Sequence, residues 1–255
     1  MARDFTVAAS QYLTLASNLG ITAYPLTMAC WFVPRNVTAT TATLMSLGTS
    51  GAATHRHTLH IFATDETIFY GANDGLTNSV FSTAAATVGA WNHACAVGIS
   101  ATDRWVYLNG GNSAQTTTSR TPVGMNNIQV GALQGAAVSL FADGPIAHVA
   151  IWNVALSATD VAALGKGLNP TRMHPESLVG YWRMDGDENG LSDIVEPPTL
   201  KGLPLRAVNG TRFIEGPPLI QQPHYHLRRD RRLVKAAAAP AGGGYRSLLT
   251  LGVGA

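Results

Sequence analysis

Charged side chains are scarce in this sequence. Asp, Glu, Lys and Arg make up 13% of the 255 residues, which is about half of the usual share in globular proteins. Small residues take their place: Gly occurs 26 times, and Thr, Ala and Ser are frequent. This composition is typical of β-sandwiches with many turns. It also suits subunits that bury surface against their neighbours, so we expect a homo-oligomer.

Cysteine and long apolar runs are also lacking. Cys30 and Cys95 are the only cysteines, too few for a disulfide framework. Each lies in an apolar strand pattern, which favours buried free thiols, although a bridge between sheets stays open as an alternative. No apolar run approaches the roughly 20 residues of a membrane helix, and no apolar segment follows the N-terminal Met-Ala-Arg-Asp as in a secretory signal. We therefore expect a protein made in a cytoplasm, without a membrane partner.

Sequence motifs of the common enzyme classes are missing as well. There is no Gly-x-Ser-x-Gly motif, no phosphate-binding loop and no His-Glu-x-x-His motif. Asp143 and His148 have no nucleophile that the sequence pairs with them. We therefore expect no enzymatic activity.

Short β-strand patterns separated by turns fill most of the chain. Strand signals at spacings of roughly 8–12 residues, with Gly, Thr, Asn and Asp between them, predict an antiparallel sandwich or barrel. The predicted strand segments are 5–16 (a strand pair), 27–34, 44–48, 58–63, 67–70, 78–83, 89–96, 104–110, 127–131 and 178–184.

A change of period predicts one short helix near residues 157–165. Ser157 is a good N-cap, and Asp160 stands three residues further on, where its carboxylate can bond back to the cap. Leu156 and Val161 are spaced for a hydrophobic staple across the cap. Two glycines just beyond the periodic residues end the helix.

From about residue 4 to residue 166 the chain resembles laminin-G-like, concanavalin-A-like jelly-roll domains. The motifs follow the family's order: the strand Gly89-x-Trp91-x-His93, the hairpin at Asn109-Gly110, and then the strand that leads into the helix. In that last strand the matching residues are Gly144, Ile146, Val149, Ile151, Trp152, Ala155, Leu156 and Ser157. The resemblance implies an all-β jelly-roll sandwich that binds glycans or proteins. Glycosidases of this class share a Glu-x-Asp-x-x-Glu strand, which is absent here.

The C-terminal residues 221–255 differ from the rest. They carry six basic side chains and one acidic, whereas residues 1–220 carry 11 basic and 14 acidic. We interpret residues 1–220 as one jelly-roll domain, in which 191–220 wrap irregularly over the body, and 221–255 as an extended docking tail. The residues expected to dock are Arg228, Arg229, Arg231, Arg232, Tyr245, Leu248, Leu249, Leu251 and Val253.

The arginines of the tail form a small patch. Asp230 interrupts them, and Tyr225 is the one aromatic side chain close by that could stack on a base. An acidic protein surface is therefore a better partner for this patch than nucleic acid.

An acidic stretch near residue 190 predicts a calcium site. Residues 185–196 fit the pattern Asp-x-Asp-x-Asn-Gly-x5-Glu, the spacing of a calcium-binding loop. The preceding strand and the following Pro197-Pro198 do not fit an EF-hand, and a solvated acidic turn is the alternative. The expected Ca²⁺ ligands are Asp185, Asp187, Asn189, the Leu191 carbonyl, Asp193 and Glu196.

Aromatic residues and histidines give weaker signals. Every tryptophan can be explained as core packing, but Trp105 and Tyr107 are the best candidates to face solvent and stack on a sugar. The histidines at 55, 57 and 60 and at 224 and 226 include pairs of alternate residues, which could meet a metal ion. Solvated or hydrogen-bonded histidine is the default interpretation.

The resemblance, the low charge and the tail together point to a bacteriophage virion protein. Domains of this kind with an apolar C-terminal tail resemble those of phage structural proteins. The prediction is a capsid decoration, tail or fibre component located in the virion, anchored to other virion proteins by residues 221–255. The alternative is a carbohydrate-binding adhesion module that recognises a host surface glycan.

Overall fold

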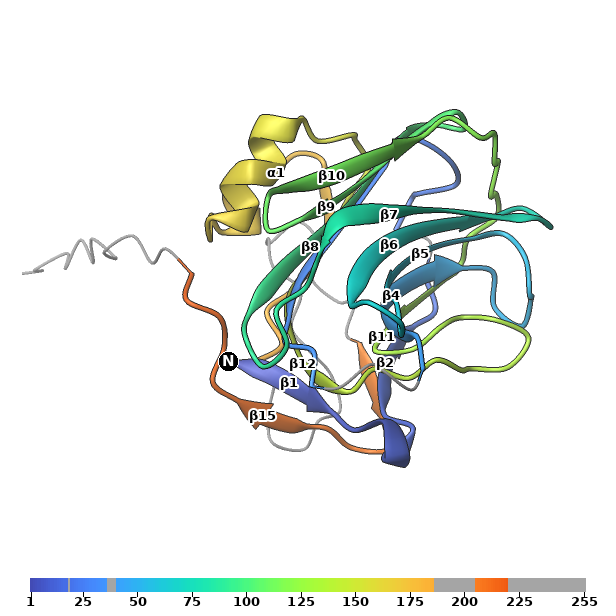
Figure 1. Ribbon diagram of the computed structural model, residues 1–255. Helices are drawn as coiled ribbons and strands as arrows, with labels where there is room; N and C mark the ends of the chain where they lie inside the picture. The colour runs from blue at the N-terminus through green and yellow to red at the C-terminus, as the bar shows by residue number, and fades with distance from the viewer. Residues whose placement is uncertain (18, 36–39, 186–204, 220–255) are drawn as a thin grey trace, which may run out of the picture. The chain divides into compact units, whose positions relative to one another are not determined.

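Two antiparallel sheets form the described part of the chain in the computed structural model (Figure 1). The structure describes residues 1–17, 19–35, 40–185 and 205–219. Within them, the first sheet contains β1 (Ala2–Phe5), β3 (Leu26–Phe32), β8 (Asn92–Ser100), β9 (Asp103–Leu108), β10 (Gly111–Thr116), β12 (Gly144–Trp152), β13 (Leu178–Trp182) and β15 (Arg212–Ile214). The second sheet contains β2 (Tyr12–Leu15), β4 (Ala42–Gly48), β5 (Arg56–Ile61), β6 (Thr67–Asn73), β7 (Thr77–Ala85), β11 (Asn127–Val130) and β14 (Arg206–Val208).

The strand order shows that the chain crosses repeatedly from one sheet to the other. The first sheet has the order β10-β9-β8-β3-β12-β1-β15, with β13 also paired to β12, and the second has the order β14-β2-β11-β4-β5-β6-β7. Consecutive strands often lie in different sheets, as in a jelly roll. The predicted concanavalin-like sandwich is thus confirmed.

A continuous apolar core lies between the sheets. Side chains alternate across a strand, so each sheet turns one apolar face inward. Phe32 and Ile146 of the first sheet meet Leu59 and Ile128 of the second, and all four are at most 2% exposed. Burial of this apolar face is the main force that holds the two layers together.

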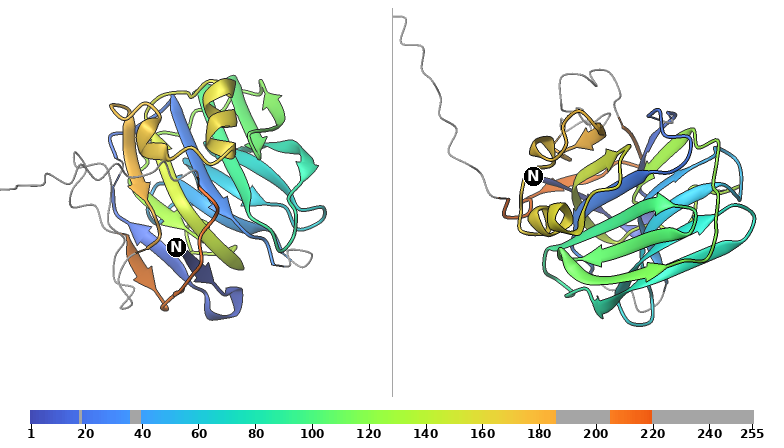
Figure 2. Two further views of the ribbon diagram at one scale, coloured as in Figure 1. Left: turned by 90° about the vertical axis from the view of Figure 1, so that its left-hand side faces the viewer. Right: turned by 90° about the horizontal axis from the view of Figure 1, so that it is seen from above.

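One α-helix occurs in the described residues, and it covers the outer face of the first sheet (Figure 2). Helix α1 (Ala158–Gly165) begins after Ser157, whose hydroxyl accepts from the Asp160 amide while the Asp160 carboxylate accepts from the Ser157 amide. Leu156 and Val161 are buried against Trp152 of the sheet. The predicted helix and its cap are confirmed.

The two cysteines lie on opposite faces of the first sheet. Cys30 belongs to the core between the sheets, whereas Cys95 belongs to the cluster under helix α1. Both are buried and free, and burial raises the pKa of both thiols. The alternative of a bridge between the sheets is wrong, because neighbouring strands place these two side chains on opposite faces.

The C-terminal part of the domain is more regular than its sequence suggests. The irregular wrap predicted for 191–220 is corrected where the structure describes it, because β14 pairs with β2 and β15 pairs with β1. The buried Asp4 carboxylate pairs with Arg35 and Arg212, at 2.5 and 3.1 Å. The short edge strands were missed because three residues give too little pattern to predict a strand.

The described residues contain no helix long and apolar enough to cross a membrane. They lie in one compact unit of the chain. The boundary at residue 220 and the docking tail stay predictions, because residues 220–255 lie outside the described residues.

Candidate functional site

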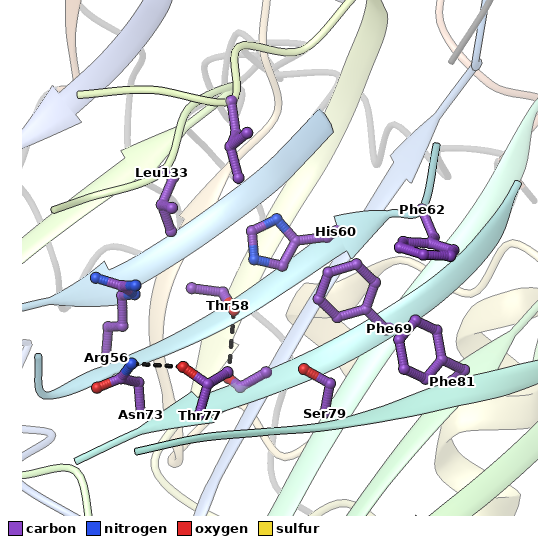
Figure 3. A pocket seen from close by; sticks show the side chains of 12 residues that line it. Arg56, Thr58, His60, Phe62, Phe69, Asn73, Thr77, Ser79, Phe81 and Leu133 are labelled. Carbon is purple, nitrogen blue, oxygen red and sulfur yellow. Dashed lines mark hydrogen bonds between the residues drawn. The ribbon is translucent and has the colours of Figure 1, made fainter. Parts of the chain in front are cut away.

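A pocket lies on the outer face of the second sheet, the face turned away from the core (Figure 3). Its volume is about 320 Å³, near the lower end of the roughly 300–1,000 Å³ of small-molecule sites. The side chains come from alternate positions of β5, β6 and β7, from Phe62 just after β5, and from two leucines of the loop after β11. The lining residues are Arg56, Thr58, His60, Phe62, Phe69, Gly71, Asn73, Thr77, Ser79, Phe81, Leu133 and Leu140.

Strand register arranges these side chains in rows across the sheet. His60 pairs with Phe69, which pairs with Phe81; Thr58 pairs with Gly71, which pairs with Ser79; and Arg56 pairs with Asn73, which pairs with Thr77. Residues in register on one face are close neighbours. The pocket therefore has an aromatic row at one end, a polar row at the other, and a row of small residues between them.

Aromatic rings form the first end. The ring centroids of Phe69 and Phe81 lie 4.9 Å apart, and Phe62 lies 5.3 Å from Phe81. His60 stacks on Phe69 at 4.5 Å. Phe81 is 40% exposed, so this end presents an apolar surface to solvent.

Gly71 forms the floor of the pocket. A Cβ atom at this position would lie 2.6 Å from Thr58 Oγ1 and 3.6 Å from Ser79 Oγ. Thr58 Oγ1 donates to the Gly71 carbonyl at 3.3 Å. The missing side chain leaves a hollow between the aromatic row and the polar row.

Amide, hydroxyl and guanidinium groups form the opposite end. Asn73 Nδ2 donates to Thr77 Oγ1 at 2.7 Å. Arg56 Nη1 donates to the Ala53 carbonyl at 2.5 Å. Because the Arg56 side chain is partly buried, desolvation lowers its pKa. A ligand in the pocket would thus meet polar groups at this end and aromatic carbon at the other.

His60 is neutral in this site. Burial, and then the nearby Arg56 charge, lower the pKa of His60 to about 3. Its Nδ1 lies 2.9 Å from Thr43 Oγ1. Among the described residues, no Asp or Glu lines the pocket. The arrangement can bind a ring that has an apolar face and polar edges, and it contains no pair of carboxylates for acid–base hydrolysis.

Trp105 and Tyr107, the residues predicted to bind a sugar, lie elsewhere. Both are on β9, and both pack in the cluster around helix α1 on the outer face of the first sheet. Tyr107 is 8% exposed, so the expectation that it faces solvent is wrong. Trp105 is half-buried, and its Nε1 donates to Asp103 Oδ1 at 2.9 Å. Sugar binding by this pair stays a prediction.

The histidines near β5 do not converge. His57 faces the core, where its Nδ1 lies 2.8 Å from the Tyr70 hydroxyl, whereas His60 faces the pocket. His55 Nδ1 accepts from the Val123 amide at 3.3 Å. In the described ranges, no group of three or more His, Cys, Asp or Glu side chains could hold a metal ion. His224 and His226 lie outside those ranges.

The predicted calcium loop and the docking tail lie almost wholly outside the described residues. Of the expected Ca²⁺ ligands only Asp185 is described, and its carboxylate pairs with the Arg183 guanidinium. Asp187, Asn189, Leu191, Asp193 and Glu196 fall outside, as do all of the expected docking residues in 221–255. Both remain predictions.

The two antiparallel sheets, packed as a jelly-roll sandwich, place the chain in the class of concanavalin-type β-sandwich proteins. The chain belongs to the concanavalin A-like lectin/glucanases superfamily, whose family model matches residues 7–162. No curated protein matches the sequence. The family contains both binding proteins and hydrolases, so membership alone does not assign an activity.

Solved structures with this fold include proteins of several kinds. A candidate carbohydrate-binding protein from Bacteroides ovatus has a TM-score of 0.60 and 17% identity, covering 83% of this chain and 58% of that one. The CBM40 of the Ruminococcus gnavus IT-sialidase, bound to α2,3-sialyllactose, has a TM-score of 0.52 and 13% identity, covering 64% of this chain and 96% of that one. Tailspike protein 2 of the Escherichia coli bacteriophage CAB120 has a TM-score of 0.50 and 17% identity, covering 73% of this chain and 28% of that one. At these identities the likeness shows the fold alone.

Proposed function

We propose that this domain is a non-enzymatic carbohydrate-binding module and that its site is the pocket on the outer face of the second sheet. The observation that carries the proposal is the cluster of the half-buried Phe62 and Phe69 with the exposed Phe81, beside hydroxyl and amide groups on the same face. A sugar ring has an apolar C–H face, which packs on an aromatic ring, and hydroxyl edges, which need hydrogen-bond partners.

The polar groups of the pocket are spaced to serve the edges of such a ring. Thr58 and Ser79 flank Gly71, and Asn73 and Thr77 lie one row further along the strands. Each can donate or accept a hydrogen bond. The carbohydrate ligand named for the CBM40 of similar fold supports the proposal without fixing the sugar for this chain.

A glycan array followed by calorimetry tests the proposal. Phe81→Ala should weaken binding at least about tenfold, which is about 1.4 kcal/mol, because an exposed aromatic surface is lost. Leu76→Ala is the matched control, since Leu76 is 68% exposed next to the same strand but does not line the pocket. Trp105→Phe tests the alternative face. The proposal would be contradicted if Trp105→Phe lost sugar affinity while Phe81→Ala kept the affinity of the wild type.

We also propose that a virion displays this domain, as a capsid decoration, tail or fibre component held by residues 221–255. A domain of this fold in a phage tailspike supports the proposal, as do the basic and apolar segments of the tail sequence. Imaging of intact particles should locate the chain on the virion surface. Removal of residues 221–255 should prevent its incorporation while the sandwich stays folded; normal incorporation of the truncated chain would count against this role.

A further inference from the structure

Arg56 is the only charged side chain among the described residues that line the pocket. Other arginines at the surface of the domain have carboxylate partners: Arg35 pairs with Asp4, for example, and Arg120 with Asp74. No ion pair to Arg56 occurs in the part of the chain that the structure describes. A partly buried guanidinium without a counter-charge carries a desolvation cost, which an incoming anion would relieve.

Hydrogen bonds hold the Arg56 side chain in place but do not use all of its N–H donors. Its Nη1 donates to the Ala53 carbonyl and more weakly to the Gln134 carbonyl, at 2.5 and 3.5 Å. In the described residues the Nε and Nη2 groups donate to no protein acceptor. A carboxylate accepts from such a pair of N–H groups in a bidentate arrangement.

The place of Arg56 relative to the rings sets the shape of the ligand. Figure 3 shows its guanidinium beside Asn73, at the end of the pocket away from Phe69 and Phe81. His60 of the aromatic row lies four positions after Arg56 on β5, a distance of about 13 Å along an extended strand. A ligand that contacts both ends must therefore lie over the hollow above Gly71, with its carboxylate at the Arg56 end.

We propose that the pocket selects an acidic sugar: a pyranose unit whose carboxylate binds the Arg56 guanidinium while its ring packs on Phe69 and Phe81. This inference rests on the proposed carbohydrate-binding function and adds the class of sugar. Uronic acids and sialic acids both carry the required carboxylate. The neutral His60 adds no second positive charge, so a single carboxylate matches the charge of the site.

Calorimetry on the full chain tests the selection with a uronic-acid oligosaccharide, a sialylated oligosaccharide and the carboxyl-reduced, neutral form of each. The wild-type protein should bind at least one acidic sugar tenfold or more tightly than its reduced form, and the acidic sugar that shows this preference identifies the source. Arg56→Gln should abolish the preference and bind both forms equally. Arg56→Lys should keep part of it, because the charge remains but the bidentate geometry is lost. Arg206→Gln, an exposed arginine of the same sheet outside the pocket, is the matched control and should change nothing.

The outcomes separate this inference from the function on which it rests. If the wild type binds acidic and reduced sugars equally, and Phe81→Ala loses this binding, the acidic selection is overturned but the proposal of carbohydrate binding stands. A preference that survives in Arg56→Gln would overturn the role of Arg56. Binding of no sugar at all would overturn both proposals.

Discussion

The rings of Phe69 and Phe81 lie 4.9 Å apart on neighbouring strands of the second sheet. They come from the outer face, where a side chain gains nothing from the core, and Phe81 is 40% exposed. Aromatic side chains at the surface beside polar groups are a frequent feature of binding surfaces. We therefore interpret this pair as part of a ligand-binding surface on the outer face of the second sheet.

Gly71 should be a sensitive position for ligand binding. Gly71→Ala places a Cβ atom 2.6 Å from Thr58 Oγ1 and fills the floor of the pocket. We expect sugar affinity to fall at least about tenfold, as measured by calorimetry. Gly111→Ala is the control, because a Cβ atom there meets nothing within 4 Å. Equal affinity in both variants would show that the ligand does not reach the floor.

Stability should fall on mild acidification because of the buried histidines. Burial lowers the pKa of His57, His60 and His93 to about 3, whereas histidine in an unfolded chain has a pKa of about 6.5. Between these values the unfolded state binds more protons, so stability is fully present above pH of about 6.5 and is lost as the pH drops toward about 3. Each histidine contributes up to about 1.4 kcal/mol per pH unit.

Urea unfolding at about pH 7.5 and about pH 5 measures this loss. His60→Gln should show a smaller difference between the two pH values than the wild type, because it removes one of the protons taken up on unfolding. An unfolding free energy of the wild type that does not change between these conditions would contradict the neutral, buried state of the three histidines.

The cap of helix α1 should contribute a modest part of the stability. Ser157→Ala removes the hydroxyl that accepts from the Asp160 amide at 3.2 Å and leaves that amide without its cap. We expect a loss of about 1 kcal/mol, or about 2–4 °C in melting temperature for a domain of this size. Scanning calorimetry measures the shift. Ser157→Thr is the control and should keep most of the stability, because Thr retains a hydroxyl that can cap the helix.

Calcium binding is a prediction that rests on sequence alone. If residues 185–196 bind Ca²⁺, millimolar CaCl₂ should raise the melting temperature, and Asp187→Asn together with Glu196→Gln should remove the increase, because both variants lose carboxylate ligands. Mg²⁺ at the same concentration is the control. An unchanged melting temperature of the wild type with Ca²⁺ would end the proposal.

Local signals in the sequence were enough for most of the strands and for the helix. The capping box at Ser157 and Asp160 is contained in four residues, and the hairpin at Asn109-Gly110 needs only two residues that tolerate positive φ, here 54° and 75°. Such features depend on neighbours in the chain. The family's motif order then extended these local elements to the fold of the whole domain.

The pocket could not be predicted in the same way, because it depends on register between strands. Phe62 follows β5, Phe69 lies on β6 and Phe81 lies on β7, and they meet only when β6 pairs with both β5 and β7 in the observed register. The alternation of β9 likewise does not reveal that helix α1 covers the face on which Tyr107 lies. The residues of the site are visible in the sequence, but the contacts between them depend on strand pairing, which the local sequence does not specify.

A crystal structure of the domain with the best-binding sugar would test the proposed site directly. We expect the sugar ring against Phe69 and Phe81, with its carboxylate on the Arg56 guanidinium. A sugar bound at Trp105 on the first sheet, or at any surface away from β5, β6 and β7, would contradict the assignment of this pocket as the binding site.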